Sequence, residues 1–90
     1  MKRYLVETYL ARGATAERAA HDRRARSAAE ELARESRRVR FDRSIHVPED
    51  EICFFVFDAP SGREAALVAQ LAGLDPFRVV EAVSPRKEKP

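Results

Sequence analysis

Residues 39–59 have the sequence VRFDRSIHVPEDEICFFVFDA, and this stretch decides the predicted fold. Apolar and polar side chains alternate over 39–47, and aromatic and β-branched residues dominate 52–58, as is typical of β-strands. The intervening residues 48–50, Pro-Glu-Asp, are typical of a turn. We therefore predict a β-hairpin. The register that keeps one face apolar pairs Val47 with Ile52, His46 with Cys53, Ile45 with Phe54 and Ser44 with Phe55.

The alternation also predicts which side chains of the first hairpin strand share a face, because successive strand residues point to opposite sides. One face receives Val39, Phe41, Ile45 and Val47, and the other receives Arg40, Asp42, Ser44 and His46. Arg43 is the exception, because the alternation places its charged side chain on the apolar face.

Two elements are predicted before the hairpin. Residues 3–9, RYLVETY, alternate like a strand, and Gly13 ends the segment. Residues 16–36 are rich in Ala, Arg and Glu, which are strong helix formers, and Thr15 supplies an N-cap hydroxyl. The buried side of this helix is predicted to carry Ala25, Ala28, Ala29, Leu32 and Ala33.

A second helix is predicted after the hairpin. Ser61 and Glu64 form a capping box, the helix runs through Ala72, and Gly73 ends it. Its buried stripe is predicted to be Leu67, Val68 and Leu71.

Residues 77–83 form a last predicted strand and complete the order β-α-β-β-α-β, which is the ferredoxin-like plan of an α+β fold. We expect one domain over 1–83, with a four-stranded antiparallel sheet and two helices on one of its faces. Residues 84–90, SPRKEKP, are expected to form a flexible tail because they have almost nothing to bury.

The face of the sheet without helices is the main functional prediction. Several aromatic side chains on an open face are unfavourable in water, so we expect a second copy of the chain to cover it. The result is a homodimer of the dimeric α+β barrel type, with a small cavity in each subunit. This face is expected to carry Leu5, Glu7, Tyr9, Ser44, His46, Cys53, Phe55 and Phe57, together with either Phe77, Val79 and Glu81 or the opposite set of the last strand.

The composition limits the class of function. Ninety residues allow one domain, and 17 basic against 15 acidic residues leave a net charge of only +2. Acidic residues interrupt the basic first helix, and residues 52–58 contain no Arg or Lys, so nucleic-acid binding is not expected. Cys53 is the only cysteine, and no apolar run is long enough to span a membrane. We therefore expect a cytoplasmic protein with no intrachain disulfide and no membrane partner.

Three stretches together resemble a known family: YLVETYL (4–10), VRFDRSIHVPEDEICFFVFDAPS (39–61) and FRVVEAV (77–83). It is a small actinobacterial domain-of-unknown-function family that is labelled nickel-binding protein. The resemblance covers residues 3–83 and implies a dimeric ferredoxin-like fold and a bound nickel ion. Several relatives carry histidine at the position of Phe55, so this chain lacks that ligand.

The residues themselves offer one candidate metal site. Transition metals favour imidazole, thiolate and carboxylate ligands. His46 and Cys53 are cross-strand neighbours in the predicted hairpin, and Glu7 is expected on the adjacent strand, so these three form the predicted metal set. The alternative is a buried, inert thiol beside an ordinary edge histidine. His21 follows Glu17 by four residues on the first helix, where a surface pair explains it more simply.

A second hypothesis is a cofactor-free isomerase, cyclase or oxygenase of the kind found among dimeric barrels. Glu7 is the predicted base, because its carboxylate is expected on an apolar surface, and His46 is the predicted proton shuttle. Glu81 is a second candidate base if the last strand has suitable parity. The alternative for Glu7 is an ion pair with Arg40 or with an arginine of a second copy. Further contacts to a small ligand are predicted at Tyr9, Ser44 and Phe55.

Overall fold

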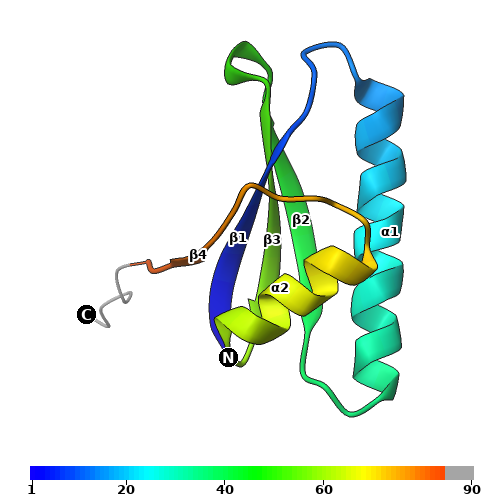
Figure 1. The fold of residues 1–90 in the computed structure, drawn as a ribbon, viewed down its shortest axis with the longest axis vertical. Helices are drawn as coiled ribbons and strands as arrows, with labels where there is room; N and C mark the ends of the chain where they lie inside the picture. The colour runs from blue at the N-terminus through cyan, green and yellow to red at the C-terminus, as the bar shows by residue number, and fades with distance from the viewer. Residues whose placement is uncertain (85–90) are drawn as a thin grey trace, which may run out of the picture.

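The computed structural model of the chain describes residues 1–84. Four strands and two α-helices follow the predicted order β-α-β-β-α-β (Figure 1). The four strands form one antiparallel sheet in the order β2-β3-β1-β4, so the fold is α+β and consistent with the ferredoxin-like plan. The elements are β1 (Lys2–Tyr9), α1 (Thr15–Arg34), β2 (Arg40–Val47), the 3₁₀ helix η1 (Pro48–Asp50), β3 (Ile52–Ala59), α2 (Gly62–Leu71) and β4 (Arg78–Ala82).

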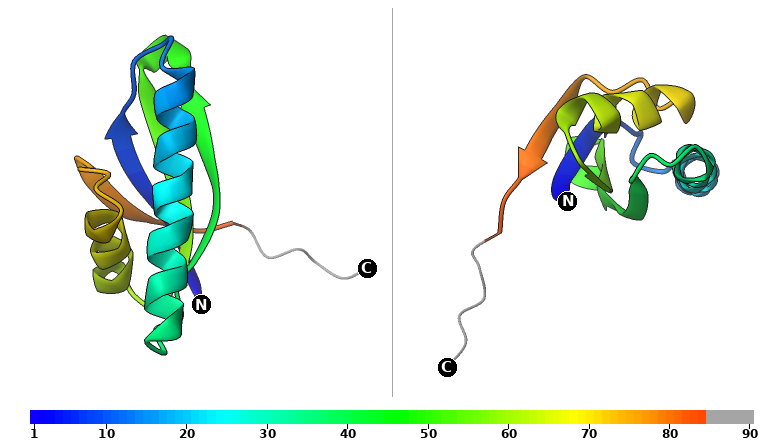
Figure 2. Two further views of the ribbon diagram at one scale, coloured as in Figure 1. Left: turned by 90° about the vertical axis from the view of Figure 1, so that its right-hand side faces the viewer. Right: turned by 90° about the horizontal axis from the view of Figure 1, so that it is seen from below.

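Both helices cover the same face of the sheet, as predicted, and the hydrophobic core lies between these two layers (Figure 2). The central strands β1 and β3 supply the bulkiest buried side chains, among them Val6, Phe55 and Phe57. The helices supply mostly alanine, which lets them approach the sheet closely while the aromatic rings of the strands fill the space. The buried helix residues are Ala25, Ala28, Ala29 and Leu32 of α1 and Ala65, Val68 and Ala69 of α2.

The hairpin of β2 and β3 has the predicted register. Its four predicted pairs are all present: Val47 with Ile52, His46 with Cys53, Ile45 with Phe54 and Ser44 with Phe55. The turn between the strands is η1, followed by Glu51 in the left-handed backbone region.

The predicted alternation of β2 is wrong in its second half. A β-bulge between Phe41 and Arg43 leaves Asp42 without a partner on β3 and shifts the strand by one residue. Phe41 therefore faces the helices together with Ser44, while Ile45 points to the other side. In the sequence, this shift appears as the charged Arg43 at a position where regular alternation predicts an apolar residue.

The first helix differs from prediction at both ends. It begins at Thr15, so the N-cap position falls on Ala14, and no side chain caps the first turn. Thr15 is therefore not the N-cap. Ala33, predicted to be buried, is exposed because the buried side of α1 ends at Leu32.

The second helix confirms its predicted start. The Ser61 hydroxyl accepts a hydrogen bond from the Glu64 backbone N–H at 3.4 Å, and Gly73 follows the helix with φ of 69°. Its buried side is rotated from the predicted one: Ala65 and Ala69 are fully buried, whereas Leu71 is 49% exposed. Alanines at the closest approach to the sheet turn the larger Leu71 outward.

The register divides the strand residues between two faces, and we call the one without helices the open face. The predicted open face is right for Leu5, Glu7 and Tyr9 and wrong for Ser44, His46, Cys53, Phe55 and Phe57, which face the helices. The reason is that Glu7 lies opposite Phe54 and not opposite Cys53. The open face carries Arg3, Leu5, Glu7 and Tyr9 of β1, Arg40, Arg43, Ile45 and Val47 of β2, Ile52, Phe54, Val56 and Asp58 of β3, and Arg78, Val80 and Ala82 of β4.

Two further predictions concern the C-terminal part of the chain and membranes. Arg78 lies opposite Glu7, and Val80 lies opposite Leu5, which fixes the parity of β4 and places Glu81 opposite Tyr4, off the open face. Within the described part of the chain, neither helix has the length and apolar character that a membrane span requires. The predicted tail lies outside the described residues, apart from Ser84.

Candidate functional site

The predicted site residues separate into two groups on opposite sides of the sheet. Glu7 and Tyr9 lie on the open face, whereas His46 and Cys53 lie on the helix-facing side. The sheet therefore divides the predicted metal set of Glu7, His46 and Cys53, and it equally divides the predicted acid–base pair of Glu7 and His46. Among residues 1–84, no three His, Cys, Asp or Glu side chains are arranged to hold a metal ion.

Polar side chains gather inside the fold, between the first half of α1 and the sheet. Arg18 of α1 donates hydrogen bonds to the Ser44 hydroxyl at 3.1 Å and to the Ser44 carbonyl at 3.0 Å. The Thr8 hydroxyl donates to the Cys53 carbonyl at 3.1 Å, and His46 Nε2 lies 3.3 Å from the Leu10 carbonyl oxygen. We call this group the inner polar cluster: Thr8, Arg18, His21, Asp22, Ser44, His46 and Cys53. Most of its hydrogen bonds go to backbone carbonyls, so they hold strands and loops in place.

Cys53 is the most deeply buried member of the inner polar cluster. Its side chain has no exposed surface, and burial raises the pKa of the thiol to about 11 although the nearby charge of Arg18 acts in the opposite direction. At neutral pH the sulfur is therefore a protonated thiol. A thiol in this state is a poor nucleophile and a poor metal ligand, which supports the inert alternative for Cys53.

His21 packs inward against the sheet and is half-buried, so it does not lie on the surface as predicted. Its ring lies 6.0 Å from the ring of Phe55 in an edge-to-face arrangement. Neither His21 Nδ1 nor Asp22 Oδ1 has a hydrogen-bond partner among the described residues. Burial lowers the pKa of His21, and the nearby charge of Arg24 lowers it further. The fold therefore disfavours the protonated imidazole.

This environment predicts a pH dependence of stability. The unfolded chain binds a proton at His21 more readily than the folded chain, so the free energy of unfolding should fall as the pH is lowered from about 7 to about 5. Above the unfolded pKa the imidazole is neutral in both states, and the effect is absent. Urea unfolding at several pH values measures it. The slope should be smaller in His21→Gln and retained in His46→Gln; equal slopes in all three proteins would contradict the assignment.

The centre of the open face is apolar. Leu5, Ile45, Phe54, Val56 and Val80 come from all four strands and lie side by side in the register. Val56 in the middle is almost fully buried, and exposure rises toward the edge, where Ile45 is 45% exposed. The strands thus present a continuous apolar surface that neither helix covers (Figure 2).

A charged network borders this apolar centre at the end of the face near the N-terminus. Arg3 pairs with Asp58 at 3.1 Å and with Asp42 at 3.2 Å. Arg40 also reaches Asp58 at 3.4 Å, and Arg43 reaches Asp42 at 3.1 Å. The two acids are thus shared among three arginines, and the network keeps its long side chains at the margin of the apolar surface.

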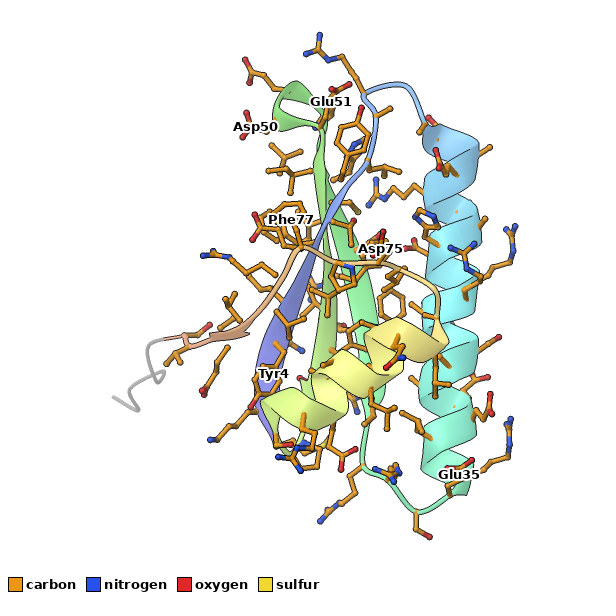
Figure 3. All side chains as sticks on the ribbon, in the orientation of Figure 1. Tyr4, Glu35, Asp50, Glu51, Asp75 and Phe77 are labelled. Carbon is orange, nitrogen blue, oxygen red and sulfur yellow. The ribbon has the colours of Figure 1, made fainter. Side chains whose placement is uncertain are left out.

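Polar groups also lie on the β1 side of the open face. The Arg78 Nε donates to Glu7 Oε1 at 3.1 Å, and the Glu7 side chain is 12% exposed. Glu7 therefore forms an ion pair, which is the alternative to its predicted role as a base. Its partner is Arg78 and not Arg40. Tyr9 donates its hydroxyl to Glu51 at 3.4 Å, and Glu51 lies at the tip of the β2–β3 hairpin (Figure 3).

The sequence analysis did not predict the arginine contacts within the inner polar cluster and on the open face. The pairing of Arg78 with Glu7 depends on the parity of β4, which the short segment 77–83 leaves open. Arg18 and Ser44 are 26 positions apart in the sequence, and no local pattern indicates their contact. Asp42 lies at the bulge, and its carboxylate reaches Arg3 of β1 on the open face.

The geometry defines a small α+β domain with one apolar sheet face that no helix covers and with a polar cluster between α1 and the sheet. No protein-family model matches the chain, and neither a curated protein nor a solved structure shows significant similarity to it.

Proposed function

We propose that the protein is a homodimer that binds a small ligand between two sheets packed through their open faces. The observation that carries this proposal is the continuous apolar surface around Val56, which lies opposite the helices. Water disfavours a contiguous apolar patch of this kind, and such patches on soluble domains mark interaction sites. The chain is also small and its helices are rich in alanine, so a second copy adds the buried area that one copy lacks.

The margins of the open face fit the anatomy of an interface. The network around Arg3, Asp42 and Asp58 lies beside the apolar centre, where it would form a charged rim. Ile45 and Tyr9 are the large hydrophobic side chains of this face that remain most exposed, at 45% and 64%. Covering them with a second sheet would remove the largest unfavourable contacts with water.

The ligand part of the proposal rests on the polar groups of the open face. Glu7, Tyr9 and Arg78 carry a carboxylate, a hydroxyl and a guanidinium on one side of an apolar surface. Ligand sites combine an apolar lining with a few polar groups that fix orientation. The nickel and enzyme hypotheses are not carried forward, because their residues lie on opposite sides of the sheet.

Sedimentation equilibrium at about 10 μM tests the dimer, since a weaker assembly dissociates at that concentration. The wild-type chain should sediment with twice its own mass, and Ile45→Arg should sediment as a monomer because it places a charge in the apolar interface. Leu71→Arg is the matched control: Leu71 is similarly exposed, at 49%, but lies on α2. A monomeric wild type, or equal dissociation of the two variants, would refute the dimer.

The ligand part is tested with anilinonaphthalene sulfonate, an apolar anion that fluoresces on leaving water. It should bind the wild-type dimer, and Arg78→Gln should weaken binding because a guanidinium on the open face is lost. Arg63→Gln, an exposed arginine of α2, should leave binding unchanged. Equal binding to the two variants would contradict a ligand site at Arg78.

A further inference from the structure

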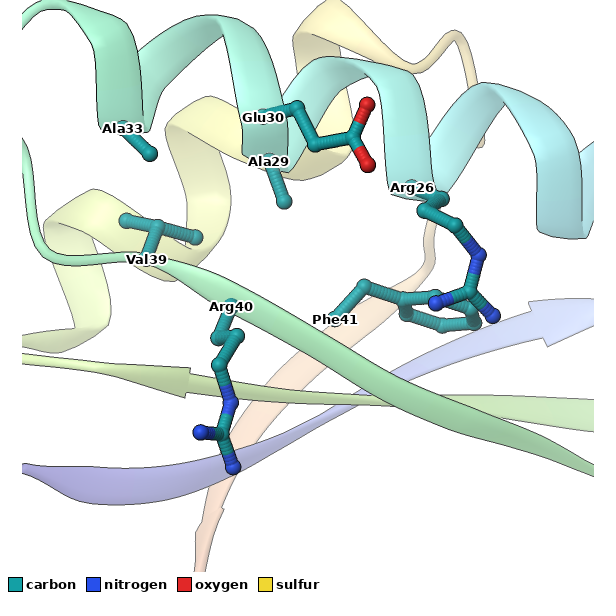
Figure 4. A pocket seen from close by; sticks show the side chains of 7 residues that line it. All are labelled: Arg26, Ala29, Glu30, Ala33, Val39, Arg40 and Phe41. Atoms are coloured by element: carbon teal, nitrogen blue, oxygen red, sulfur yellow. The ribbon is translucent and has the colours of Figure 1, made fainter.

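We infer that a groove between α1 and β2 binds a small free α-amino acid with an apolar side chain. The groove has a volume of about 150 Å³ (Figure 4). It lies on the helix layer at the β2 edge, away from the open face, so it does not depend on the proposed function. Its lining residues are Arg26, Ala29, Glu30 and Ala33 of α1 and Val39, Arg40 and Phe41 in and before β2.

The floor of the groove is apolar and built from the core. Ala29, Val39 and Phe41 are each at least 94% buried, so they are held in place by the packing beneath them. Ala33 extends the floor along α1 (Figure 4). A short aliphatic side chain would gain contact with these four residues and leave water, at no cost in rearranging the core.

The rim of the groove carries one cation, Arg26, and one anion, Glu30. Arg26 and Glu30 stand one helical turn apart on α1, and neither forms an ion pair within residues 1–84. The Arg26 guanidinium lies over the Phe41 ring, 5.1 Å from its centre, which holds its planar donors in a fixed position. The Arg40 guanidinium points away from the groove, toward Asp58 (Figure 4).

These charges fit a zwitterion. A carboxylate matches the fork of donors on Arg26, and an ammonium group matches the free carboxylate of Glu30. A ligand with both groups next to a short apolar side chain satisfies rim and floor together, whereas a simple fatty acid would bring its carboxylate close to Glu30. The α-amino acids have this arrangement of groups.

The structure favours a free amino acid over a peptide. The groove is smaller than the roughly 300 Å³ at which sites for larger ligands begin. A peptide that adds to the β2 edge needs a regular strand, and the bulge at Asp42 interrupts this edge within the groove region. A peptide terminus also carries only one of the two charges.

Titration of the isotope-labelled full chain with L-leucine, followed by NMR, tests the inference. Amide signals of the floor residues should shift and saturate, with a dissociation constant on the order of 1 mM, as befits a ligand of few atoms. Leucinamide lacks the carboxylate and resembles a peptide N-terminus, and N-acetylleucine lacks the ammonium group and resembles a peptide C-terminus. Each should bind about fivefold more weakly or worse, and so should glycine, which lacks the apolar side chain.

The protein variants supply the complementary test. Arg26→Gln and Glu30→Gln should each weaken leucine binding about fivefold, whereas Glu30→Gln should not weaken N-acetylleucine binding, because that ligand has no ammonium group for Glu30 to hold. Arg23→Gln and Glu31→Gln are matched controls on the same helix that do not line the groove. The inference is refuted by an absence of shifts at about 20 mM leucine, by equal binding of leucine and its two derivatives, or by equal losses in controls and test variants.

Discussion

Cys53 in the folded protein should react with a disulfide reagent at least about 100-fold more slowly than Cys53 in the unfolded chain at about pH 8. The thiolate is the reactive form, and burial raises the pKa of this thiol to about 11, which reduces the thiolate fraction to about one in a thousand at that pH. The sulfur is also inaccessible, because Cys53 has no exposed surface. The two effects act in the same direction, so both the low thiolate fraction and the lack of access slow the reaction of the native thiol.

The measurement uses Ellman's reagent on native protein and on protein in concentrated guanidinium chloride. An accessible control is Ser27→Cys in a Cys53→Ala background, because Ser27 is exposed on α1. This control should react at a similar rate with and without denaturant. Rapid modification of native Cys53 would show that the thiol is open to solvent and would revive its role as a metal ligand.

Phe55→Ala should be the most damaging of the simple truncations, with a loss of about 3–5 kcal/mol in the free energy of unfolding. Phe55 is fully buried between α1 and the sheet and contacts the rings of His21 and Phe41. The free energy of unfolding of a domain of this size is about 5–13 kcal/mol, so the variant loses a large share of its stability. Thermal unfolding should shift by about 4–8 °C for each kcal/mol lost.

Phe77→Ala is the control for this prediction. Phe77 is 60% exposed before β4, so its truncation removes little buried surface and should change stability by less than about 0.5 kcal/mol. The pair also tests the assignment of faces, since the alternation first placed Phe55 on the open face. A mild effect of Phe55→Ala, comparable with that of Phe77→Ala, would mean that Phe55 is not a core residue.

Much of the fold is predictable from local patterns. The N-cap at Ser61, the glycine after α2 and the hairpin register each follow from physical rules that act over a few residues. The order of elements then restricts the sheet to few arrangements. These features need no knowledge of distant contacts, and the structure confirms them.

The assignment of faces failed because it depends on contacts between distant strands. Alternation gives two sets of side chains for each strand, but only the register of β1 on β3 decides that Glu7 shares its face with Phe54. A single wrong choice of parity moved Cys53 and His46 to the wrong side and produced a metal set that the sheet divides. The sequence of β3 does not indicate which face of the strand is buried, because its residues are mostly apolar on both faces.

The bulge at Asp42 also indicates where related chains can differ in length. Phe41 and Arg43 lie opposite Phe57 and Val56, which are adjacent on β3, so loss of Asp42 would straighten β2 and leave the other side chains of the strand on their present faces. Such a deletion would cost the ion pairs of Asp42 with Arg3 and Arg43. A one-residue deletion within the regular half of β2 would instead exchange inside for outside, so length changes among homologues should concentrate at Asp42 and at the hairpin tip.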